Sequence, residues 1–184
     1  GLEGILKVPE VYLDPVGREL EHLLTGFLQG FTHVLVEAAE FLAQAGAGAV
    51  ATQAFANTSF GPRGLEMMSA GLSAEETLAR LLQNDPDREL RQVGLVDNNG
   101  RAASFTGQGC FHWADGVAGQ GYAIQGNILK SGRVVPAMEK AFLKTKGNLP
   151  KRLHAALLAG DRAGGDKRGR QSAAMYVVKP NGGY

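Results

Sequence analysis

The stretch Gly46-Ala47-Gly48-Ala49-Val50-Ala51-Thr52-Gln53-Ala54 sets small residues and an amide into a β-prone run. It predicts a buried strand over residues 47–54, whose small side chains let another layer pack tightly against it. Two later stretches share this character: Gly121-Tyr122-Ala123-Ile124-Gln125-Gly126-Asn127-Ile128-Leu129, and Gly164-Gly165-Asp166-Lys167-Arg168-Gly169-Arg170-Gln171-Ser172-Ala173-Ala174. In all three stretches the small residues would let the backbone and the polar side chains lie close to another part of the protein or to a ligand.

Apolar side chains recur every three or four residues between Arg18 and Gln44. This is the helical period, so we expect a long amphipathic helix there, in one piece or two, ended by Ala45-Gly46. Polar residues interrupt it too often for a membrane span.

The rest of the chain alternates predicted helices and strands. Asp97-Asn98-Asn99-Gly100 joins two predicted strands as a hairpin, and Ser73 with Glu76 forms a capping box. The expected helices are 62–69, 74–83, 134–144 and 149–158, and the expected strands are 90–97, 101–106, 122–128 and 171–178. This order favours an α+β layered fold.

Composition narrows the function classes. At 184 residues we expect a single domain, 1–184, and the net charge of +1 gives no support for nucleic-acid binding. The lone Cys110 suits a reducing, cytoplasmic setting, and we expect no signal peptide. No Cys/His spacing suggests a metal, and nothing calls for a cofactor.

Candidate site residues lie in the three quoted stretches. Gln125 and Asn127 flank a glycine inside a β-prone run, where their amides would hold a substrate carbonyl or carboxylate; an ordinary bulge is the alternative. Gln53 ends the first strand, with Asn57 after it, although a plain turn at Asn57 also fits. Cys110 and His112 lack a third orienting group, so we do not expect a catalytic pair.

The glycine-rich stretch near the end of the chain offers a carboxylate, a guanidinium and a hydroxyl in Asp166, Arg170 and Ser172. Arginine grips carboxylate or phosphate through two parallel hydrogen bonds. Alternatively, Asp166 pairs with Arg168 or Arg170 and only fixes the loop.

Over residues 45–184 these stretches resemble a bacterial family of unknown function with an N-terminal-nucleophile (Ntn) hydrolase-like fold. The resemblance implies a layered α-β-β-α sandwich and, by analogy, hydrolysis of an amide bond by an N-terminal Thr, Ser or Cys. Residues 1–44 differ from the family as an atypical helical segment, and Gly1 has no side-chain nucleophile.

Two functions follow as expectations. In the first, the protein is an amidohydrolase relative acting on a small amide or carbamoyl compound, with Asn127 and Asp166 catalytic and with Gln53, Gln125, Arg170 and Ser172 binding the substrate. In the second, it is a non-catalytic binding or assembly protein, a homo-oligomer whose interface is the 18–44 helix.

Overall fold

A computed structural model describes residues 10–13, 22–25, 40–170, 173, 175–178 and 180. Within these residues the fold is mixed α/β, with two antiparallel sheets and four α-helices. The four-stranded sheet has the order β3-β4-β5-β6, and its strands are β3 (Glu40–Gln44), β4 (Gly48–Ala54), β5 (Arg91–Asp97) and β6 (Ala102–Thr106).

The five-stranded sheet has the order β7-β8-β1-β2-β9. Its strands are β1 (Glu10–Leu13), β2 (His22–Thr25), β7 (Asp115–Gly119), β8 (Tyr122–Gly126) and β9 (Tyr176–Val178). β1 is antiparallel to β8: Glu10 lies opposite Ile124, in the middle of β8, and Tyr12 lies opposite Tyr122 at its start.

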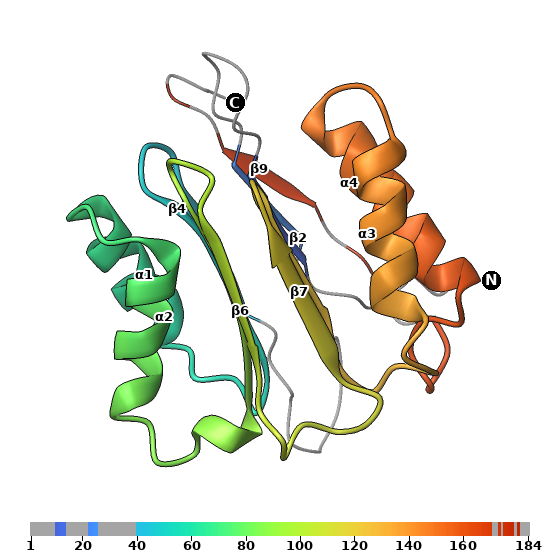
Figure 1. Ribbon diagram of the computed structural model, residues 1–184, viewed down its shortest axis with the longest axis horizontal. Coiled ribbons are helices and arrows are strands. Elements are labelled where there is room, and N and C mark those ends of the chain that lie inside the picture. The colour runs from blue at the N-terminus through green and yellow to red at the C-terminus, as the bar shows by residue number, and fades with distance from the viewer. Residues whose placement is uncertain are drawn as a thin grey trace.

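The helices form two pairs, each on the outer face of one sheet (Figure 1). α1 (Phe60–Ser69) and α2 (Ala74–Gln83) cover the four-stranded sheet, and α3 (Val134–Lys144) and α4 (Leu149–Arg162) cover the other. A short 3-10 helix, Arg88–Leu90, leads into β5. The layers therefore run helices, sheet, sheet, helices.

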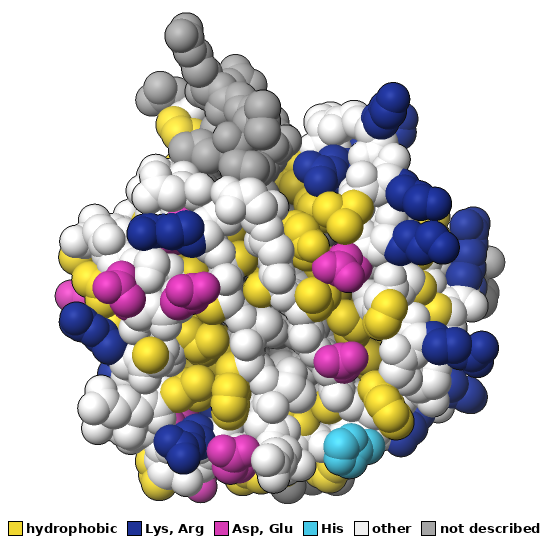
Figure 2. All heavy atoms as spheres, viewed as in Figure 1, with side chains coloured by type: hydrophobic (Ala, Val, Ile, Leu, Met, Phe, Trp, Pro, Cys, Tyr) yellow, Lys and Arg dark blue, Asp and Glu magenta, His cyan; other side chains and the backbone are white. Residues whose placement is uncertain are grey.

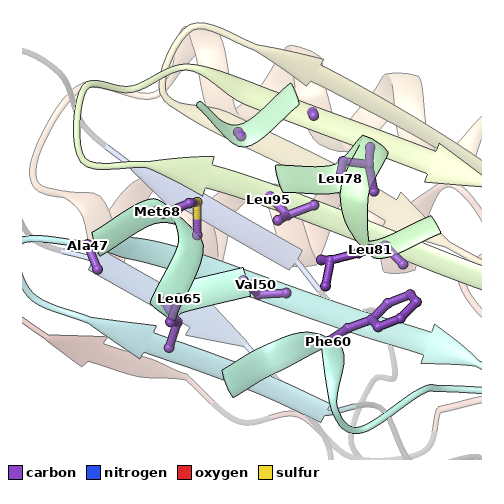
Figure 3. Packing of buried hydrophobic residues seen from close by; sticks show 11 residues of the cluster. Ala47, Val50, Phe60, Leu65, Met68, Leu78, Leu81 and Leu95 are labelled. Atoms are coloured by element: carbon purple, nitrogen blue, oxygen red, sulfur yellow. The ribbon is translucent and has the colours of Figure 1, made fainter. Parts of the chain in front are cut away.

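Each helical pair is held to its sheet by an apolar core of large side chains. Figure 3 shows Phe60 and Leu65 of α1 with Leu81 of α2 facing Val50 and Leu95 of the sheet. On the other side, Ile124 of β8 packs with residues of α3 and α4. Burial of these side chains drives the layering, because each fully buried one contributes about 1.5–3 kcal/mol.

The layer between the sheets is different, because small side chains line part of it. Its buried apolar residues are Ala49, Ala51, Val96 and Ala123. A Cβ added at Gly94 would lie 2.8 Å from Gln125 Oε1, and one at Gly116 would lie 2.5 Å from Ser104 Oγ. A methyl group at either glycine would therefore require the facing side chain to shift. The tight packing predicted for residues 47–54 is confirmed.

The predicted helix from Arg18 to Gln44 is wrong wherever the structure describes it. Residues 22–25 and 40–44 are strands, and the remainder lies outside the described residues. The reason is visible in β3, where Leu42 packs toward the helices and Ala43 toward the other sheet. A strand apolar on both faces has no clear two-residue alternation, so its run of apolar residues can be mistaken for a helix.

Most other predicted elements are confirmed. α2 and α3 have the predicted bounds, and the Ser73–Glu76 capping box is present. α1 begins two residues early, and α4 runs four residues beyond the expected end. The sequence prediction missed β7, because Asp115-Gly116-Val117-Ala118-Gly119 has too many glycines to resemble a strand. β8 is shorter than predicted, and the described part of the last strand is Tyr176–Val178.

Charge is segregated between the two helical layers. Figure 2 shows Lys and Arg side chains gathered on the side of the molecule formed by α3 and α4. Residues 130–170 contain eleven Lys or Arg and only three Asp or Glu. The net charge of +1 therefore conceals a basic face.

Candidate functional site

The polar part of the inter-sheet layer lies at one end of the sandwich. Gln53 at the end of β4 is opposite Gln92 at the start of β5, and Gln92 is opposite Thr106 at the end of β6. In the facing sheet Gln125 is near the end of β8, and Asn127 follows that strand. We call Gln53, Gln92, Gln125 and Asn127 the amide cluster.

Gln92 is the centre of this cluster, and it is fully buried. Its Oε1 accepts hydrogen bonds from Gln53 Nε2 and, at 3.3 Å, from Asn127 Nδ2. Its Nε2 has three acceptors, Thr106 Oγ1 at 2.9 Å and the carbonyl oxygens of Asp115 at 3.1 Å and Gly126 at 3.0 Å, so two of them share one of its two hydrogens. One side chain thus joins β4, β5 and β6 to β7 and β8.

Three buried oxygens near this centre lack a hydrogen-bond donor. They are Gln53 Oε1, Gln125 Oε1 and Ser104 Oγ. The Nε2 atom of Gln125 donates to the Ala51 carbonyl at 3.1 Å, so that side chain is anchored by one end only. An unpaired buried carbonyl oxygen costs about 1–3 kcal/mol, and a bound N–H or O–H donor would remove that cost.

Two strained residues directly follow members of the cluster. Ala54, after Gln53, has φ 63°, and Ile128, after Asn127, has φ 55°. Such a left-handed conformation is rare for alanine and an outlier for a β-branched residue. Strain of this kind clusters at functional sites, where the surroundings enforce it.

Asp166 and Arg170 form ion pairs of their own. Asp166, 3% exposed, accepts hydrogen bonds from the backbone N–H, Nε and an Nη atom of Arg168. Arg170 forms a two-hydrogen-bond pair with Asp161 of α4, at 3.1 and 2.7 Å. The Asp166–Arg168 pair is consistent with the alternative from the sequence, in which Asp166 pairs with a nearby arginine and fixes the loop.

The glycine-rich loop nevertheless runs beside the segment that follows the cluster. Leu129 and Asp166 form a β-bridge, and the backbone N–H of Lys167 donates to the Ile128 carbonyl at 2.8 Å. The loop therefore supports the backbone two residues beyond Asn127. Ser172 lies outside the described residues.

Asn57 forms a turn, which was the second of the two interpretations of this residue from the sequence. Its Oδ1 accepts from the backbone N–H and hydroxyl of Ser59, and its Nδ2 donates to Asp85 at 3.3 Å. Asp85 also accepts from Arg91 Nε at 2.9 Å. This hydrogen bond from Arg91 is the main reason why the pKa of the Asp85 carboxyl lies below its ordinary value.

Cys110 and His112 do not form a catalytic pair. The Cys110 thiol is buried and donates to the Arg91 carbonyl at 3.3 Å, whereas the His112 ring packs edge-on against Trp113. Burial raises the pKa of the Cys110 thiol, which disfavours the nucleophilic thiolate.

The sequence analysis missed Gln92, the residue with the most contacts in the site. The only available signal was its position, since Gln92 is an uncharged polar residue inside a predicted strand, Leu90–Asp97. Its partners lie up to 39 residues away along the chain, and no local pattern announces them.

Comparison with known proteins assigns the chain to a family. A family of unknown function, DUF1028, matches residues 31–183. The chain belongs to this family. It is also similar to a crystal structure of protein SPO2555 from Silicibacter pomeroyi, described under the same family, with 28% identity, a TM-score of 0.78, and coverage of 94% of this chain and 73% of that one. No curated protein matches the sequence.

The part of the chain that the structure describes has neither a metal-binding cluster nor a membrane-spanning helix. No group of three or more His, Cys, Asp or Glu side chains there could hold a metal ion. None of the described helices has the length and apolarity needed to cross a bilayer.

Proposed function

We propose that this family member hydrolyses a small amide or carbamoyl compound bound at the amide cluster. The observation that carries the proposal is the pair of buried, donor-less carbonyl oxygens on Gln53 and Gln125. Gln53 and the half-buried Asn127 both donate to Gln92 Oε1, and Gln125 precedes Asn127 by two residues. Asn127 Nδ2 has a second hydrogen besides the one that it donates to Gln92. Acceptors and a donor at one place complement the N–H and C=O groups of an amide.

Each end of a substrate amide has a partner in this arrangement. Its N–H groups would donate to Gln53 Oε1 and Gln125 Oε1, which removes the cost of leaving those atoms unpaired. Its carbonyl oxygen would accept the second Asn127 Nδ2 hydrogen, since the first goes to Gln92. The same Asn127 hydrogen would stabilise negative charge as that oxygen becomes an oxyanion.

The topology supports an Ntn-type reaction at this place. Sheets between helical layers are the arrangement that the Ntn resemblance implies, and β1 enters its sheet with Glu10 opposite Ile124, next to Gln125. The proposed reaction needs a Thr, Ser or Cys nucleophile with a free α-amino group at the cluster. As its oxygen or sulfur attacks the substrate carbonyl, the α-amino group would accept the hydroxyl or thiol proton and pass it to the leaving nitrogen while the C–N bond breaks. Water would then hydrolyse the acyl-enzyme and release the acid.

Turnover of an amide panel tests the proposal. We would measure release of ammonia from acetamide, benzamide and urea, and of the corresponding amine from their N-substituted analogues, by the wild-type protein, Asn127→Ala and Asn99→Ala. Asn99 is an exposed asparagine in the β5–β6 hairpin, at the other end of the sandwich, and serves as the matched control. Loss of an oxyanion donor lowers kcat by about 10²–10³-fold, so Asn127→Ala should lose activity on that scale.

The melting temperatures decide how the result is read. Asn127 makes a single 3.3 Å hydrogen bond, so its loss should leave the fold intact. Equal activity of Asn127→Ala and Asn99→Ala would contradict the site, and wild-type protein inactive on the whole panel would contradict the reaction. Intact-mass spectrometry of the active protein identifies its first residue and hence the nucleophile.

A further inference from the structure

Three exposed aromatic side chains lie on two connecting segments, Phe55 directly after β4 and Phe111 and Trp113 ahead of β7. Phe55 is 39% exposed, Phe111 is 50% exposed and Trp113 is 49% exposed. The rings of Phe55 and Phe111 face each other with centroids 5.8 Å apart and an interplanar angle of 46°. Exposed apolar side chains that gather in one place mark binding surfaces more often than single ones do.

The Phe55–Phe111 pair bridges the two sheets at the cluster. Phe55 lies two residues after Gln53, and its backbone N–H donates to the Leu90 carbonyl, beside the start of β5. Phe111 accepts a 2.9 Å hydrogen bond from the backbone N–H of Ile128, which directly follows Asn127. Each ring is therefore attached to a backbone segment that also holds a cluster amide.

The backbone under these rings is fixed on both sides. The Phe55 carbonyl accepts from an Arg91 Nη atom at 2.5 Å, and Arg91 is itself held by Asp85. On the other side, Leu129 and Trp113 exchange backbone hydrogen bonds at 3.2 and 2.9 Å. A backbone that is already ordered loses little further freedom when a ligand arrives, which favours affinity.

Small-molecule sites combine an apolar wall with a few well-placed polar groups. The amide cluster supplies the polar groups, and the ring pair supplies an apolar wall beside them. We infer that the substrate carries a flat apolar group, such as an aromatic ring, on its amide or carbamoyl carbon, and that Phe55 and Phe111 bind that group. This inference rests on the proposed function.

Binding of a matched ligand pair tests it. We would measure the Kd of benzamide and of acetamide by calorimetry for the wild-type protein, Phe55→Ala, Phe111→Ala and Leu143→Ala. Leu143 is 58% exposed on α3 and serves as the control for removing an exposed apolar side chain. We expect wild-type protein to prefer benzamide, each Phe→Ala change to weaken benzamide about five- to tenfold, and acetamide binding to stay unchanged.

The outcomes separate this inference from the proposed function. Equal affinity for benzamide and acetamide would overturn the role of the rings and leave the amide site standing. Failure of both ligands to bind would overturn the proposed function itself. A lower molar mass of the Phe55→Ala/Phe111→Ala double variant in light scattering would show that the rings join copies of the chain, which also overturns the inference.

Discussion

At the scale of single residues, Gln92 and Gln125 are both fully buried glutamines in the same inter-sheet layer, but they differ in how many of their hydrogen-bonding groups have partners. Gln92 makes five hydrogen bonds, to groups on both sheets. Gln125 makes one, and its Oε1 has no donor. We infer that Gln92 holds the site together, and that the unpaired Oε1 of Gln125 is free to accept a hydrogen bond from a ligand.

This contrast predicts the effects of one substitution at two positions. Gln92→Met leaves the groups that contact Gln92 without their hydrogen-bond partner, so it should lower the free energy of unfolding by about 3 kcal/mol. Gln125→Met keeps the volume, removes an unpaired oxygen and loses one hydrogen bond, to the Ala51 carbonyl. The first loss offsets the second, so the free energy of unfolding should change by less than about 1 kcal/mol. Urea unfolding of both variants measures this, and equal losses would show that Gln125 is as satisfied as Gln92.

Asp85 gives a pH-dependent prediction. Its lowered folded-state pKa, caused first by the Arg91 hydrogen bond, means that ionised Asp85 stabilises the fold at any pH above the ordinary carboxyl value of 3.8. That stabilisation is lost as the pH falls through the lowered value. Asp85→Asn should therefore cost about 2 kcal/mol at pH 7, and this cost should begin to fall once the pH is below 3.8.

Urea unfolding at pH 7 and at a series of pH values below 3.8 measures the difference. Asp87→Asn is the control, because the Asp87 side chain is 60% exposed and its contact with Arg91 is long, at 3.3 Å. A cost for Asp85→Asn that does not change with pH would rule out the ion pair as its source.

At the scale of elements, the predictable parts are those with local signals. The capping box fixed the start of α2, and Asp97-Asn98-Asn99-Gly100 announced the β5–β6 hairpin. β3 was mistaken for helix because Leu42 and Ala43 are packed on opposite faces, and β7 was missed because glycines dominate it. In the site, Gln53, Gln125 and Asn127 could be predicted because they lie in glycine- and alanine-rich, β-prone stretches. The role of Gln92 could not be predicted, because its partners come from four other strands.

The close approach of the two sheets predicts a coupling between Gly94 and Gln125. A Cβ at Gly94 would lie 2.8 Å from Gln125 Oε1, so Gly94→Ala should cost about 1–3 kcal/mol. Shortening Gln125 to alanine removes that clash. A double-mutant cycle should therefore give a coupling of at least about 1 kcal/mol, and additive effects would mean that the sheets separate freely.

At the scale of the whole molecule, the basic face predicts behaviour that the net charge of +1 does not. We expect retention on a cation exchanger at pH 7, because exposed Lys140 and Lys144 belong to a face where basic side chains predominate. Lys140→Glu/Lys144→Glu should elute at clearly lower salt. Arg63→Glu/Arg80→Glu changes the net charge equally on the α1–α2 side, and equal shifts of the two variants would contradict a localised face.

The amide cluster as the substrate site is the central claim, and side-chain NMR tests it most directly. Benzamide would be titrated into 15N-labelled protein while the NH2 resonances of Gln53, Gln92, Gln125 and Asn127 are followed. The account predicts saturable shifts of these four pairs, with Asn99 unmoved. Shifts that map to another surface, with the four pairs unchanged at saturation, would contradict it.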